Sequence, residues 1–122
     1  MLIRPLYLLL MCLGIVLPTP STAQKLDIIF INPGFESNNS TGDFWLNVSE
    51  FAKAAAYDLD MQLTVEYAQR NHIEVLNIAQ KASLKQPDAI IIVNEKKAGV
   101  RLIKEIAKYD IPIFLLLNTL SN

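Results

Sequence analysis

The chain alternates between short apolar runs and longer segments in which apolar residues recur at helical spacing. Four runs predict strands, at 26–32, 61–67, 88–94 and 111–117. Three of these are nearly continuous in aliphatic residues, whereas 61–67 alternates apolar and polar positions. Strands that are apolar on both faces are typical of parallel sheets covered by helices on both sides.

The segments between these strands predict three helices. The first spans 43–59, with Asp43 as its N-cap, and the second begins after Asn71, another residue type that favours this position. The second helix ends at Pro87, because proline disfavours helical backbone in the residue before it. The third helix spans 95–109. Strands and helices that alternate in this way predict an α/β fold with a doubly wound, Rossmann-like parallel sheet.

Residues 1–23 have a different character from the rest of the chain. They hold a single charge, Arg4, and an apolar run over 6–17 that is followed by small residues. This is the pattern of a secretory signal peptide, and it predicts cleavage after Ala23 and a mature chain of 24–122. The apolar run is shorter than the roughly 20 residues that a transmembrane helix needs. We therefore expect the chain to be exported.

Composition excludes several classes of function. The 122 residues allow one domain at most, and a hydrophobic content of 52% excludes intrinsic disorder. Eleven basic and 12 acidic residues leave no net basic field, so we expect no nucleic-acid partner. The one cysteine, Cys12, lies in the predicted signal peptide, which leaves the mature chain without thiol chemistry. Glycine-rich nucleotide motifs and nucleophile elbows are also absent, so we expect no cofactor, no metal and no enzymatic activity.

The predicted strand ends hold the candidate binding residues. In a doubly wound sheet, ligands bind beyond the carboxyl ends of the strands. Three of the four ends carry an asparagine: Asn32, Asn94 and Asn118. An amide offers both a donor and an acceptor, which suits a neutral polar ligand such as a sugar. Asparagine also favours turns for its own sake, and the sequence leaves both interpretations open.

An aromatic pair stands where the first loop turns into the first helix. Phe44 and Trp45 follow Asp43 there, and an aromatic ring can stack on the apolar face of a sugar. Adjacent helical residues point about 100° apart, so we expect one ring to pack inward and the other to face the cleft. The predicted ligand-binding residues therefore include Asp43 and both aromatics. Only amides and aromatics are recognised at the strand ends, and the nearby acids Glu36 and Asp43 have loop and cap explanations.

Taken together, these features resemble the N-terminal lobe of the type I periplasmic binding proteins, a family that includes the sugar receptors of ABC importers. The resemblance rests on the signal peptide, the opening strand at 28–32, the aromatic pair, and the segments 86–92 and 111–114. It covers residues 25–122. Each motif is weak alone, but their order and spacing are specific.

The resemblance implies two α/β lobes that close on a ligand between them. In the family's sugar binders, contacts come from the aromatic pair and from a polar residue after the fourth strand, which correspond here to Phe44, Trp45 and Asn118. Asn94 lies at a third strand end that also faces the cleft. The implied function is binding of a sugar-like ligand for an ABC permease, in the periplasm and without catalysis.

Three departures from the family pattern keep alternatives open. Asn118 and Thr119 replace the family's usual Asp-Arg pair, and the first loop is longer by residues 36–41. Such a loop also occurs in relatives that bind autoinducer-2 and report to a sensor kinase. The chain stops at Asn122, so we expect 24–122 to be an incomplete part of the binding protein. The alternatives are a sensor-kinase receptor and a small exported α/β enzyme.

Overall fold

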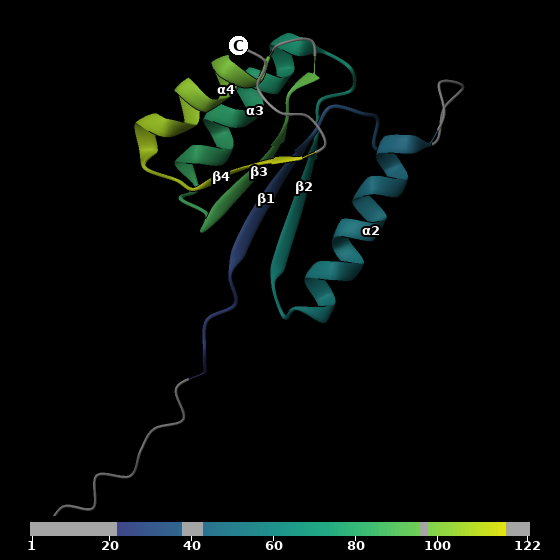
Figure 1. The fold of residues 1–122 in the computed structure, drawn as a ribbon, viewed down its shortest axis with the longest axis vertical. Coiled ribbons are helices and arrows are strands. Elements are labelled where there is room, and N and C mark those ends of the chain that lie inside the picture. The colour runs from purple at the N-terminus through teal and green to yellow at the C-terminus, as the bar shows by residue number, and fades with distance from the viewer. Residues whose placement is uncertain (1–21, 38–42, 96–97, 117–122) are drawn as a thin grey trace, which may run out of the picture.

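The four predicted strands form one parallel sheet. The structure is a computed structural model that describes residues 22–37, 43–95 and 98–116. Its strands are β1 (Asp27–Asn32), β2 (Gln62–Tyr67), β3 (Ala89–Val93) and β4 (Ile113–Leu116). They lie in the order β2-β1-β3-β4, and each neighbouring pair is parallel (Figure 1). The predicted α/β class is therefore confirmed.

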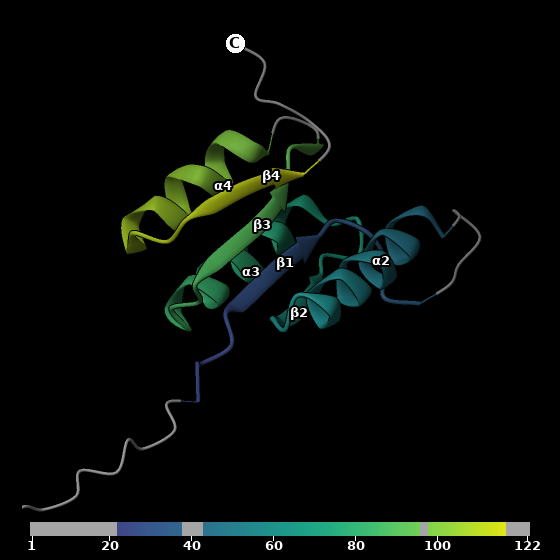
Figure 2. The ribbon, with the colours of Figure 1, turned by 60° about the horizontal axis from the view of Figure 1, so that its bottom comes forward.

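Helices cover both faces of this sheet. They are α2 (Phe44–Asp58), α3 (His72–Leu84) and α4 (Gly99–Ile106), which continues into the 3₁₀ helix η3 (Ala107–Tyr109). The chain moves outward from β1 to β2, then crosses back past β1 to β3 and on to β4. Because such crossovers are right-handed, α2 covers one face, and α3 and α4 cover the other. Figures 1 and 2 show α3 and α4 together, with α2 apart from them. The sheet is doubly wound, as predicted.

The main core lies between the sheet and the layer formed by α3 and α4. Its strand residues alternate along β1 and β3, and are Ile29, Ile31, Ile90 and Ile92. The two helices contribute Ile78, Ala79, Ala82, Leu102 and Ile106. Phe30 points to the opposite face, where α2 lies, and is fully buried. The apolar character of both strand faces thus has the cause inferred from the sequence.

One helix start differs from the prediction, and one predicted cap lacks its side-chain bond. The third helix begins at Gly99 instead of residue 95, because the Asn94 side-chain oxygen accepts a hydrogen bond from the Gly99 amide at 3.0 Å. Asp43 occupies the N-cap position of α2, but its side chain makes no capping hydrogen bond. Asn71 does cap α3, since its side-chain oxygen accepts from the amides of Ile73 and Glu74.

The predicted signal peptide lies almost entirely outside the described residues, so the export prediction and the cleavage site stay predictions. Within the described ranges, no helix is both long enough and apolar enough to cross a bilayer.

Candidate ligand-binding site

A hollow of about 550 Å³ opens at the carboxyl ends of the strands. It is bounded by the loop after β1, the first turn of α2, and the loops that follow β2 and β3. Its lining residues are Gly34, Phe35, Ser37, Phe44, Trp45, Leu46, Arg70 and Glu95. This is the place where a doubly wound sheet binds its ligands, and we treat it as the candidate site.

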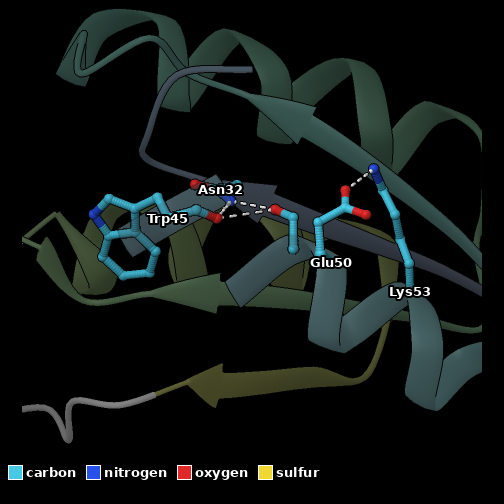
Figure 3. Close-up of polar contacts among 5 residues, drawn as sticks. Asn32, Trp45, Glu50 and Lys53 are labelled. Atoms are coloured by element: carbon cyan, nitrogen blue, oxygen red, sulfur yellow. Dashed lines mark hydrogen bonds and ion pairs between the residues drawn. The ribbon is translucent and has the colours of Figure 1, made fainter. Parts of the chain in front are cut away.

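Asn32, at the end of β1, joins the loop to α2 beneath this site. Its Nδ2 donates to the Trp45 carbonyl oxygen at 2.8 Å and to Ser49 Oγ at 2.5 Å, as Figure 3 shows. Its Oδ1 accepts from the Gly34 amide at 2.8 Å. Asn32 and Ser49 are both fully buried. The hydrogen bonds of this amide are therefore made inside the fold, and of the two interpretations left open for Asn32 the structural one applies.

Gly34 sets how closely the loop after β1 approaches α2. A Cβ at this position would lie 2.3 Å from the Trp45 Cβ and 2.8 Å from its Cγ. No side chain fits that space, so the close approach depends on glycine. Asn32 and Gly34 together hold the Trp45 backbone and the base of its side chain in one place.

The aromatic pair lines the site with both of its rings. The Phe44 and Trp45 ring centroids lie 5.0 Å apart and their planes are inclined by 80°, an edge-to-face contact. Phe44 is 59% exposed and Trp45 is half-buried. The expectation that one ring would pack into the core is wrong, because this contact brings both side chains to the same hollow.

An ion pair that the sequence reasoning missed crosses the site. Arg70 Nη1 lies 2.5 Å from Glu95 Oε1, and both side chains line the hollow. The side chains are 39% and 26% exposed, respectively. The statement that the strand ends offer only amides and aromatics is therefore wrong. Both residues come within three positions of a strand end, so the rule that singled out the asparagines also applied to them.

The loop that carries Arg70 has an unusual backbone. Gln69 and Arg70 adopt left-handed conformations, with φ of 53° and 62°. Such conformations are unfavourable for residues with side chains and persist where the surroundings fix them. Here the Gln69 amide donates to the Gly34 carbonyl and the Arg70 amide donates to the Pro33 carbonyl, each at 2.9 Å. These two bonds attach the loop after β2 to the loop after β1 and position Arg70 at the hollow.

The remaining predicted residues lie beside the hollow or outside the description. Asp43 precedes the aromatic pair and does not line the hollow, and its buried Oδ1 has no partner among the described residues. Asn94 also does not line it, and it shapes the start of α4 next to Glu95. Asn118 lies outside the described residues. A ligand role for these three residues stays a prediction.

The described side chains of the site offer non-covalent contacts. Its rings offer stacking surfaces, and its ion pair offers hydrogen-bond donors and acceptors at one wall. The described part of the chain holds no group of three or more side chains suited to a metal ion. Lys53, whose pKa is raised by its hydrogen bond with Glu50, belongs to α2 beyond the lining residues (Figure 3).

Comparison with known proteins gives matches among solved structures alone. No protein-family model matches the sequence, and no curated protein matches it. The chain is similar to a periplasmic sugar-binding protein from Pseudomonas fluorescens, with 31% identity and a TM-score of 0.67. It is also similar to a glucose-galactose binding protein from Geobacillus stearothermophilus, with 27% identity and a TM-score of 0.68. These matches cover 78% and 80% of this chain, respectively.

The resemblance to the periplasmic sugar-binding proteins is confirmed. A third match, an ABC transporter solute-binding protein from Agrobacterium vitis with bound allitol, shares the fold at 17% identity and a TM-score of 0.63. The chain spans 28%, 34% and 30% of these three binding proteins. The similarity therefore concerns one part of that architecture. At the level of the family, these neighbours are binding proteins and not enzymes.

Proposed function

We propose that residues 24–122 form one ligand-binding lobe of a periplasmic binding protein that captures a sugar-like ligand for an ABC permease. The observation that carries this proposal is the hollow at the carboxyl ends of the strands, with Phe44 and Trp45 on one wall. Aromatic rings suit the apolar face of a sugar ring, and the Arg70–Glu95 pair suits its hydroxyl groups. Nothing in the comparisons favours the alternatives of a sensor-kinase receptor or an exported enzyme.

Affinity for the isolated chain is expected to be weak. In a two-lobe protein, part of the ligand's contacts come from the opposing lobe, and closure adds to the affinity. The walls described here supply contacts on one side only. A dissociation constant in the millimolar range, which corresponds to about −4 kcal/mol, is the expected order for such a site.

Trp45 makes this weak binding measurable, because it is the only tryptophan in the sequence. The 122-residue chain is titrated with glucose, galactose and allitol while its indole fluorescence and its indole ¹H–¹⁵N resonance are followed. A saturable change with one of these compounds supports the proposal. No saturable change with any sugar or polyol, for a chain whose spectrum shows a folded protein, would refute it.

A pair of matched variants separates the site from the rest of α2. Phe44→Ala removes a ring that lines the hollow, and is expected to weaken binding by about threefold to tenfold. Phe51→Ala removes a ring that is 77% exposed on the same helix and does not line the hollow, and is expected to leave affinity unchanged. Equal effects of the two substitutions would place the ligand elsewhere.

A further inference from the structure

The ion pair at the hollow differs from the other ion pairs of the described residues. Four of the five pairs use lysine, and only Arg70–Glu95 uses arginine. It is also the only one whose two partners line the hollow. A guanidinium presents five N–H donors in a fixed plane, whereas a lysine ammonium is a flexible point charge. A planar donor fork therefore stands beside a carboxylate at the wall of the candidate site.

Both partners keep hydrogen-bonding capacity after they have paired. The described residues give Arg70 one side-chain hydrogen bond, from Nη1 to Glu95 Oε1, and they give Glu95 Oε2 no donor. The side chains are 39% and 26% exposed, so the unused groups can reach a molecule in the hollow. The pair thus offers donors from one residue and an acceptor from the other, side by side.

The backbone that carries this pair is fixed by hydrogen bonds within the fold. Arg70 has a left-handed backbone conformation, which the hydrogen bond from its amide to the Pro33 carbonyl maintains. The Gln69 amide makes the equivalent hydrogen bond to the Gly34 carbonyl. Glu95 follows β3 closely, next to the Asn94 side chain that bonds the start of α4. A ligand would therefore meet a donor and an acceptor that already lie together in the fold.

We propose that the Arg70–Glu95 pair selects neutral ligands with adjacent hydroxyl groups and discriminates against their anionic counterparts. This inference rests on the proposed function. One hydroxyl can accept from the guanidinium while its neighbour donates to the free oxygen of the carboxylate. A ligand carboxylate must instead compete with Glu95 for Arg70, and the like charge of Glu95 repels it.

The test compares galactose with galacturonate, which differ at one position as hydroxymethyl and carboxylate. The 122-residue chain is titrated with both at neutral pH, through the Trp45 indole resonance, and the ratio of the two dissociation constants is measured. Glu95→Gln removes the competing charge and leaves Arg70 without an anionic partner. We expect this variant to shift the ratio toward galacturonate by about tenfold, because hydrogen bonds to charged groups are the stronger ones.

Three further variants control for charge and for structure. Arg70→Gln is expected to shift the ratio in the opposite direction, since the Glu95 carboxylate then stands alone. The double variant, with both residues as glutamine, restores neutrality and is expected to return the ratio toward its original value while weakening galactose. Glu66→Gln makes the same charge change at the Lys85 pair, away from the hollow, and is expected to leave the ratio unchanged.

The outcomes distinguish this inference from the proposed function. If the unaltered chain binds galactose but Glu95→Gln leaves the ratio unchanged, the ion pair does not select the ligand and only this inference fails. A loss of thermal stability without a change in the ratio would assign the pair a purely structural role, with the same result. If the unaltered chain binds neither sugar nor polyol, the proposed function fails and the inference fails with it.

Discussion

We expect that replacing Asn32 with alanine destabilises the fold and does not remove a direct contact with a ligand. The side chain is fully buried and makes three hydrogen bonds, to the Gly34 amide, the Trp45 carbonyl and Ser49 Oγ. A buried hydrogen bond contributes about 1 kcal/mol net, and a buried group left without a partner costs about 1–3 kcal/mol. Ser49 Oγ still donates to the Trp45 carbonyl at 3.2 Å, so the Gly34 amide is the group that loses its partner. We expect Asn32→Ala to lower the free energy of unfolding by about 3 kcal/mol.

Urea denaturation followed by Trp45 fluorescence measures this change directly. Ser49→Ala is the matched control, because it removes one of the three Asn32 bonds and leaves the Asn32 amide bonded to Trp45 and Gly34. It also removes the longer Ser49 Oγ bond to the Trp45 carbonyl, so its expected cost is about 1–2 kcal/mol. If Asn32→Ala costs no more than Ser49→Ala, the network is not what holds the loop to α2. A variant with unchanged stability and weakened ligand binding would return Asn32 to the ligand-binding residues.

Two further predictions concern local packing and capping. Gly34→Ala places a Cβ 2.3 Å from that of Trp45, and the resulting overlap should lower the free energy of unfolding by about 1–3 kcal/mol, measured by denaturation. It should also shift the Trp45 emission maximum, measured by fluorescence. An unchanged spectrum and an unchanged denaturation midpoint would show that α2 moves freely against the loop. Asn71→Ala removes the N-cap of α3, where the side chain accepts from two amides, and should lower the free energy of unfolding by about 1 kcal/mol. Asn71→Asp should preserve stability, because aspartate is also a good N-cap. Equal losses of stability in the two variants would contradict the capping role.

The strands and the fold class were predicted well from the sequence, because a strand that is buried on both faces has a continuous run of apolar residues. The aliphatic runs of β1 and β3 have that composition since helices cover the sheet on both sides. The start of α4 was misplaced because periodicity does not record the hydrogen bond between the Asn94 side chain and the Gly99 amide. Hydrogen bonds of this kind, from a backbone amide to a side chain, can shift the start of a helix by a few residues.

The candidate site was only half accessible to sequence reasoning. The adjacent aromatic pair stood out because both residues are of one chemical kind and lie at a loop-to-helix junction. Arg70 and Glu95 are 25 positions apart in the chain, and they meet across the end of β1, which lies between β2 and β3 in the sheet. The left-handed backbone at Gln69 and Arg70 could not be predicted from the sequence, because neither residue is a glycine. The role of Asn32 stayed open because a position at a strand end fits a ligand contact and an internal link equally well.

The bonds that surround Gly34 have a thermodynamic consequence for recognition. The Gly34 amide is held by Asn32, its carbonyl is held by the Gln69 amide, and the missing side chain admits Trp45. Three segments of the chain are thereby joined at the wall of the site in the absence of a ligand. Binding then needs to order little polypeptide on this side, so the loss of conformational entropy that usually opposes association is small here. The entropy change of ligand binding, measured by calorimetry, should therefore come from the ligand and its displaced water more than from the ordering of this part of the protein.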